Sequence, residues 1–128
     1  MNDTEKITLN LSAVDLGKVD LLVQEALYSN RTDFIRTAIR NQLERHSEEI
    51  GQVVTRHSFI IGVLIYDRKE LLAYKARHER LSISVVGLLR LQKDIEVSLA
   101  REVIESIKVR GILDMPAELK SALKDRIH

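Results

Sequence analysis

Apolar and polar residues alternate along residues 6–12 of the chain. A period of two is typical of a β-strand with one face buried and the other in solvent. Three apolar residues share one face of this segment, namely Ile7, Leu9 and Leu11. Three polar residues share the other face, namely Lys6, Thr8 and Asn10. The pattern therefore predicts a short, half-buried strand near the N-terminus.

After residue 12 the spacing of apolar residues changes to the steps of three and four that are typical of an amphipathic helix. The first such stripe comprises Leu16, Val19, Leu22, Val23 and Ala26. The second comprises Phe34, Ile35, Ala38, Ile39 and Leu43. Ser12 and Asn30 precede the two stripes, and both residue types are good N-caps. We therefore predict two helices after the strand, the second ending near His46.

The remaining chain contains an internal repeat centred on Gly62, Gly87 and Gly111, which are 25 and 24 residues apart. Each glycine lies within an apolar run that turns polar, and a short helical pattern then follows over 70–79, 97–105 or 117–126. The unit is therefore a strand, a turn and a helix, of a size typical of a leucine-rich-repeat-like solenoid. The glycines are expected to allow close backbone approach or a bend in each strand.

A small βαββαβ sandwich is the competing architecture for this region, but only three convincing strands are found. Apolar residues occur on both faces of these strands. One face carries Val63, Leu88 and Ile112, and the other carries Leu64, Leu89 and Leu113. Since this pattern suggests that neither face is solvated, we expect the region to join dimers into tetramers.

The composition is that of a soluble, ordered protein, with 45% hydrophobic and 30% charged residues. The absence of cysteine excludes disulfides and thiolate metal sites. The N-terminus lacks the core of a signal peptide, and the longest apolar stretch, residues 59–66, is too short to cross a membrane. We therefore expect a cytoplasmic protein. The formal net charge is only +1, so a claim of nucleic-acid binding must rest on local arrangement.

A strand and two helices in about 40 residues cannot bury a core alone, and an unpaired strand edge is a liability. A dimer solves both problems if two copies of residues 6–12 pair antiparallel above four helices. The apolar faces of the strands then meet the helices, and the polar faces of both copies form one exposed surface. A two-stranded ribbon has the right width to enter the major groove of DNA.

Residues 5–46 resemble a ribbon-helix-helix DNA-binding domain of the Arc/MetJ/CopG superfamily. The resemblance rests on the strand, the cap Ser12, the turn at residues 28–32 and the start of the second helix. It covers about a third of the chain, and the combination of these short signals is fairly specific. The fold class expected for the whole chain is α+β: a β-α-α module that forms an intertwined dimer, followed by an α/β region of about three strand-turn-helix repeats.

The resemblance implies that the outward strand residues Lys6, Thr8 and Asn10 contact bases. It also implies that Asn30, Arg31 and Thr32, at the start of the second helix, contact phosphate. The chemistry of these residues agrees, because Asn can pair with adenine, Lys with guanine and Thr with thymine. Backbone amides at a helix start suit a phosphate oxygen. The acidic residues of the first helix are expected to point away from DNA, and they are Asp15, Asp20 and Glu25.

We expect residues 1–46 to be the DNA-binding and dimerisation domain, 47–56 a linker, and 57–128 a domain for oligomerisation or sensing. The function expected is sequence-specific binding of double-stranded DNA by a transcriptional regulator, a repressor, that acts as a homodimer or tetramer. A small effector or a protein partner would bind the C-terminal domain, and no membrane contact is expected. Two alternatives stay open: an antitoxin that represses its own promoter and binds a toxin, and a non-DNA assembly protein.

No metal, cofactor or catalytic residue is expected. A nickel-responsive branch of the same superfamily has a metal-sensing domain, but the four histidines here are scattered and form no His-x-His pair. They are His46, His57, His78 and His128. The sequence contains no phosphate-binding loop and no nucleophile elbow, so an enzyme is not indicated.

Overall fold

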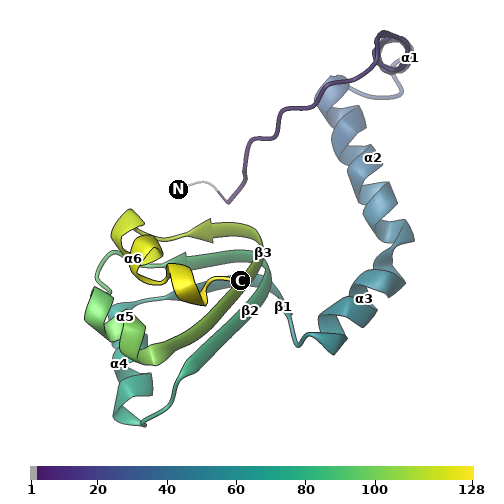
Figure 1. The fold of residues 1–128 in the computed structure, drawn as a ribbon. Helices are drawn as coiled ribbons and strands as arrows, with labels where there is room; N and C mark the ends of the chain where they lie inside the picture. The colour runs from purple at the N-terminus through teal and green to yellow at the C-terminus, as the bar shows by residue number, and fades with distance from the viewer. Residues whose placement is uncertain (1–2) are drawn as a thin grey trace. The chain divides into compact units, whose positions relative to one another are not determined.

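The computed structural model describes residues 3–128, which fall into two compact units (Figure 1). One unit comprises residues 6–53 and is helical. The other comprises residues 54–128 together with the N-terminal segment up to Glu5, and it contains the sheet. Together the two units make an α+β chain. Each unit is described by itself below.

Helices α1 (Ala13–Gln24) and α2 (Arg31–Arg45) confirm the two helices expected after residue 12. Each begins at the expected cap, because the Ser12 hydroxyl accepts a hydrogen bond from the backbone N–H of Asp15 at 3.2 Å. The Asn30 side chain likewise accepts one from the N–H of Asp33 at 2.8 Å. These bonds satisfy backbone donors that a helix start leaves without a partner inside the helix. Local sequence thus fixes both helix starts.

Two segments of the helical unit differ from expectation. Residues 6–12 are not assigned to a strand, because a strand requires a hydrogen-bonded neighbour and the described part of a single chain places none beside them. Residues 47–56, expected to link the two domains, form helix α3 (Ser47–Arg56), which spans the boundary between the two units after Val53. Glu48 and Glu49 in its first turn favour a helix start, and Gly51 alone is too weak a breaker to prevent it.

The second unit is built on a parallel sheet in the order β1-β2-β3, with a helix after each strand. The strands are β1 (Ile60–Tyr66), β2 (Leu81–Leu91) and β3 (Ile104–Asp114). The helices are α4 (Arg68–Ala76), α5 (Val97–Val103) and α6 (Ala117–Ala122), followed by a 3-10 turn, η1 (Lys124–Arg126). Parallel neighbours need such crossover connections, and here each crossover is one short helix.

The three glycines of the sequence alignment lie side by side across the sheet. Gly62 is paired with Gly87, and Gly87 with Gly111. All three have positive φ, from 130° to 146°. A Cβ atom on Gly87 would lie 2.1 Å from the carbonyl oxygen of Gly62, and one on Gly111 would lie 2.1 Å from that of Gly87. The expected close backbone approach is therefore present, and a side chain at either position would prevent it.

One face of this sheet packs against α4, α5 and α6, which lie together on the same side (Figure 1). The shared core includes Leu71 of α4, Val103 of α5 and Leu119 of α6, all essentially inaccessible to solvent. Leu89 of β2 lies at its centre and is fully buried. On the opposite face, Ile61, Val63 and Ile65 of β1 are exposed.

Candidate nucleic-acid interface

The expected base-contacting residues lie on the extended segment before α1. Lys6, Thr8 and Asn10 are all exposed. The three apolar residues between and after them are exposed as well, with Ile7 82%, Leu9 57% and Leu11 40% accessible. Large apolar side chains left in solvent in such a regular pattern mark a surface that another molecule covers. The described chain places the polar side chains on one segment but does not organise them into a strand face.

An apolar groove lies between this segment and the two helices. Leu9 and Leu11 line it from the segment, Val19 and Leu22 from α1, and four apolar residues from the first half of α2. The charged residues Asp15 and Lys18 of α1 also line it. The α2 residues are Phe34, Ile35, Ala38 and Ile39. The groove holds about 540 Å³, and Val19 is the only buried apolar residue of α1 and α2. The helical unit therefore has apolar side chains that could form a hydrophobic core, but in the single chain almost none of them is buried.

The expected phosphate-contacting residues form the start of α2, where several contacts fix the backbone. Asn30 caps the helix, and the Asp33 carboxylate accepts a hydrogen bond from the N–H of Ser29 at 3.0 Å. Tyr28 packs edge-on against Phe34, with 5.0 Å between ring centroids. This reciprocal capping and its adjacent aromatic contact fix the angle at which the chain enters the helix. These contacts hold the backbone at the exposed start of α2, where the helix dipole places partial positive charge.

Arg31 forms a contact that sequence reasoning missed. Its guanidinium donates two hydrogen bonds of 2.8 Å to the two carboxylate oxygens of Asp20 on α1. The hydrogen bond from Arg31 holds the pKa of Asp20 below its usual value, and the same contact raises the pKa of Arg31. Asp20 was expected to point away from the interface, but it lies against an expected phosphate contact. The two residues are eleven positions apart on different helices, so no local periodicity could reveal the pair.

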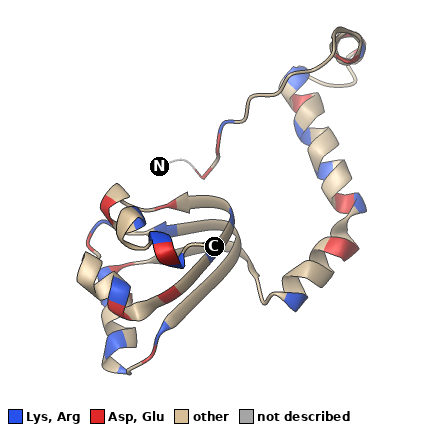
Figure 2. Ribbon diagram, in the orientation of Figure 1, with Lys and Arg blue, Asp and Glu red and all other residues tan. Residues whose placement is uncertain are grey.

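Charge on α2 is mixed along its length, with Lys or Arg and Asp or Glu both present (Figure 2). Thr32, in its first turn, is exposed and lies beside Arg31. Basic residues thus occur along the whole of α2, from Arg31 to Arg45, and its first turn also contains Asp33, so the start of the helix is not more basic than the rest.

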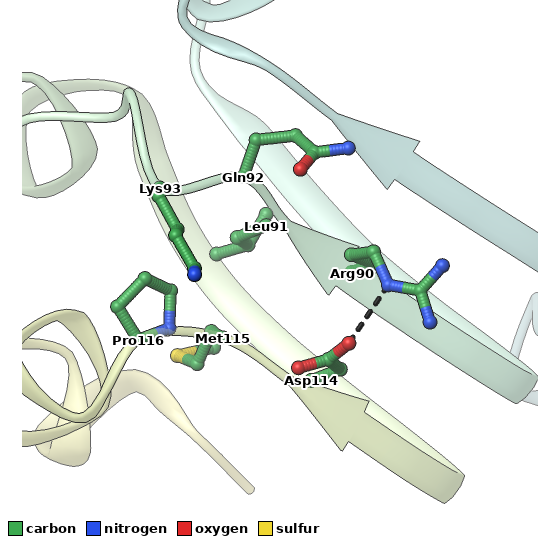
Figure 3. A pocket seen from close by; sticks show the side chains of 7 residues that line it. All are labelled: Arg90, Leu91, Gln92, Lys93, Asp114, Met115 and Pro116. Atoms are coloured by element: carbon green, nitrogen blue, oxygen red, sulfur yellow. Dashed lines mark hydrogen bonds and ion pairs between the residues drawn. The ribbon is translucent and has the colours of Figure 1, made fainter. Parts of the chain in front are cut away.

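The sheet unit has a small pocket at the carboxyl ends of β2 and β3 (Figure 3). Arg90 donates to Asp114 across it at 2.7 Å, and that hydrogen bond is the main reason for the raised pKa of Arg90. Lys93 and Pro116 complete the rim. The volume of about 130 Å³ is below the roughly 300–1,000 Å³ of typical small-molecule sites. We therefore assign no effector to this pocket.

Two findings hold for residues 3–128, the part of the chain that the structure describes. No cluster of three or more His, Cys, Asp or Glu side chains there could hold a metal ion. None of the helices there combines the length and apolar character needed to span a bilayer.

Comparison with known proteins gives two matches. The model of the ribbon-helix-helix transcriptional regulator family matches residues 2–120. The transcriptional regulator CdrS of Halobacterium salinarum is 28% identical over 47 residues, which are 37% of this chain and 86% of that protein. No solved structure matches the chain significantly. The family match extends through the sheet unit, well beyond the segment on which the resemblance rested.

Proposed function

Because this chain belongs to the ribbon-helix-helix transcriptional regulator family, a family of DNA-binding regulators, we propose that it represses transcription by reading the major groove with a β-ribbon shared by two copies. The observation that carries this proposal is the regular exposure of Ile7, Leu9 and Leu11 beside an apolar groove. We further propose that residues 1–46 are the DNA-binding and dimerisation module. Residues 57–128 would form the domain for oligomerisation, or for binding an effector or protein partner.

The proposed dimer supplies the hydrogen-bonded neighbour that residues 6–12 need. Two antiparallel copies of this segment satisfy each other's backbone groups and turn their apolar faces toward the grooves below. Burying a leucine-sized side chain contributes about 1.5–3 kcal/mol. Three such residues from each copy, together with the groove lining, therefore give a strong drive to dimerise. The polar faces of the two strands then form one surface that fits the major groove.

In this arrangement Lys6, Thr8 and Asn10 from both copies contact base edges. The backbone amides at the start of α2, with Asn30 and Thr32, bind a phosphate on either side. Arg31 contributes a forked cationic donor next to them. Its pairing with Asp20 reduces the charge available to DNA, so Asp20 is expected to limit affinity without affecting sequence preference.

Asp20→Asn is therefore expected to strengthen binding to all DNA sequences by a few-fold. The substitution removes a negative charge beside the phosphate and releases the Arg31 side chain. Fluorescence anisotropy with a specific and a random duplex, each titrated over salt concentration, would measure the effect. The slope of log affinity against log salt is expected to steepen, because each extra neutralised phosphate adds about 0.9. Glu25→Gln, an exposed position at the end of the same helix that does not line the groove, serves as the matched control, and an equal gain there would contradict a specific role for Asp20.

Leu9→Asp is expected to abolish the dimer and specific DNA binding together. A charged carboxylate at this position would have to be buried between two copies without a partner. Sedimentation velocity measures the assembly, and anisotropy measures DNA binding on the same preparation. Leu21→Asp is the control, because Leu21 is also exposed on the helical unit, at 55%, but does not line the groove. Unchanged assembly and DNA binding in Leu9→Asp would overturn the proposed dimer.

The proposed function as a whole is tested by selecting bound sequences from random duplex DNA with the intact protein. We expect an enriched motif with two related half-sites, because a symmetric ribbon reads a symmetric site. Enrichment without any motif, or no binding at all at low salt, would contradict a sequence-specific regulator.

A further inference from the structure

Strand β1 is an exposed, uncharged edge of the parallel sheet. It lies outermost in the order β1-β2-β3, and its sequence from Ile60 to Tyr66 contains no charged residue and no proline. Four of its side chains are large, apolar and exposed: Ile60 54%, Ile61 64%, Val63 55% and Ile65 44%. An edge strand presents a row of unpaired backbone donors and acceptors, and proteins normally protect such edges with charges, bulges or a covering segment.

The other edge of the same sheet shows that protection. The C-terminal segment runs alongside β3, with an isolated bridge between Ile107 and Ile127. The backbone N–H of His128 donates to the carbonyl oxygen of Ile107 at 2.8 Å. Strand β3 also carries Lys108 and Arg110, and the latter donates to the carbonyl oxygen of His128. One edge of the sheet, β3, is therefore covered by the C-terminal segment, whereas the other edge, β1, is exposed. This difference points to a partner that covers β1.

We propose that β1 pairs antiparallel with β1 of a second copy of this chain, so that two sheets join into one. This inference rests on the proposed function in one respect: the ribbon already holds two copies together, which gives a neighbouring β1 a high effective concentration. A twofold axis between identical parallel sheets requires the two edge strands to run in opposite directions. The pairing would use backbone groups that the described chain leaves at an open edge.

The features of β1 favour its own copy over a different protein. The edge has no charge by which an acidic or basic partner could be selected, but an identical apolar strand matches it fully. A register centred on Val63 places Ile61 opposite Ile65 and keeps Asp67 and Arg68 outside the paired region. Gly62 adds room for close approach, because a Cβ atom there would meet nothing within 4 Å. Pairing would also cover Val63, which is exposed beside its buried neighbour Leu88 on β2.

The chain contains no cysteine, so a single introduced cysteine can form disulfides only between copies. In an antiparallel pair centred on residue 63, the two Cβ atoms at that position lie roughly 4.5–5.5 Å apart, which allows a disulfide after small adjustments. We expect Val63→Cys in the full chain to form a covalent dimer under mild oxidation, at least ten-fold faster than Glu105→Cys. Glu105 is exposed on β3, away from the proposed contact. Equal rates for the two variants would overturn the proposal.

A second variant separates specific pairing from random collision. Ile65→Lys in the Val63→Cys background places a charge within the proposed contact, and we expect it to slow crosslinking at least ten-fold. Ile65 is exposed, so the fold of the sheet unit should survive, and circular dichroism checks this. Crosslinking that continues at the original rate would contradict the pairing. DNA binding of the same preparations tests the regulator function separately: binding without crosslinking refutes only the β1 contact, and crosslinking without binding refutes only the regulator.

Discussion

Replacing Gly87 with alanine is expected to lower the free energy of unfolding of the sheet unit by about 3–5 kcal/mol. Two costs combine at this position. The backbone has φ of +139°, which side chains rarely adopt, and the new Cβ atom would lie 2.1 Å from the carbonyl oxygen of Gly62. Since the contact is with backbone, β1 and β2 would have to separate locally. Urea unfolding followed by circular dichroism, at one protein concentration, gives the change in stability.

Gly62→Ala is the matched control for this prediction. Gly62 has a similar φ of +146°, but a Cβ atom there meets nothing within 4 Å. It should therefore show the backbone strain, about 1–3 kcal/mol, without a clash inside the chain. A loss at Gly87 no larger than that at Gly62 would mean that the strands do not approach each other as closely as the structure indicates.

Asn10→Ala is expected to remove most of the sequence preference that each ribbon strand contributes at one base pair. A bidentate contact from asparagine to adenine gives about 1–3 kcal/mol of discrimination, which is roughly a ten- to hundred-fold preference per half-site. Because a symmetric site contains two half-sites, the total loss of discrimination free energy is twice the loss at one half-site. The measurement compares affinities for the selected duplex and for the same duplex with that base pair changed.

Two other variants separate a base contact from a phosphate contact and from a position that contacts no DNA. Arg31→Ala should weaken binding to all sequences alike, because a phosphate contact carries no sequence information. Asn41→Ala changes the same residue type on the exposed surface of α2 and should leave both quantities unchanged. A loss of preference in Arg31→Ala, with none in Asn10→Ala, would reverse the proposed roles of strand and helix.

Much of the local structure could be predicted because it depends on neighbours in the chain. Ser12 and Asn30 cap their helices through residues three positions away. The alignment of Gly62, Gly87 and Gly111 anticipated their register in the sheet, since each strand repeats the same run of side chains. The family resemblance of residues 5–46 was also confirmed, and the family match extends to residue 120.

Other features of the candidate site could not be predicted, because they depend on contacts distant in sequence. The pairing of Arg31 with Asp20 requires the actual orientation of α1 against α2. The helical conformation of residues 47–56 was not predicted, because their polar composition suits an exposed helix as well as a loop. The alternation of residues 6–12 indicates a strand, but a strand also needs a hydrogen-bonded neighbour, and the alternation does not show which segment that neighbour is.

The sequence by itself determined where α1 and α2 begin, which residues share a face, and that the chain carries a ribbon-helix-helix pattern. These properties follow from short-range hydrogen bonds and from the period of the apolar residues. Only the tertiary structure decided that Asp20 neutralises Arg31, that one sheet edge is closed by the C-terminal segment, and that the edge at β1 stays open. Those outcomes depend on which surfaces meet after folding, and the order of residues along a strand or helix does not specify that.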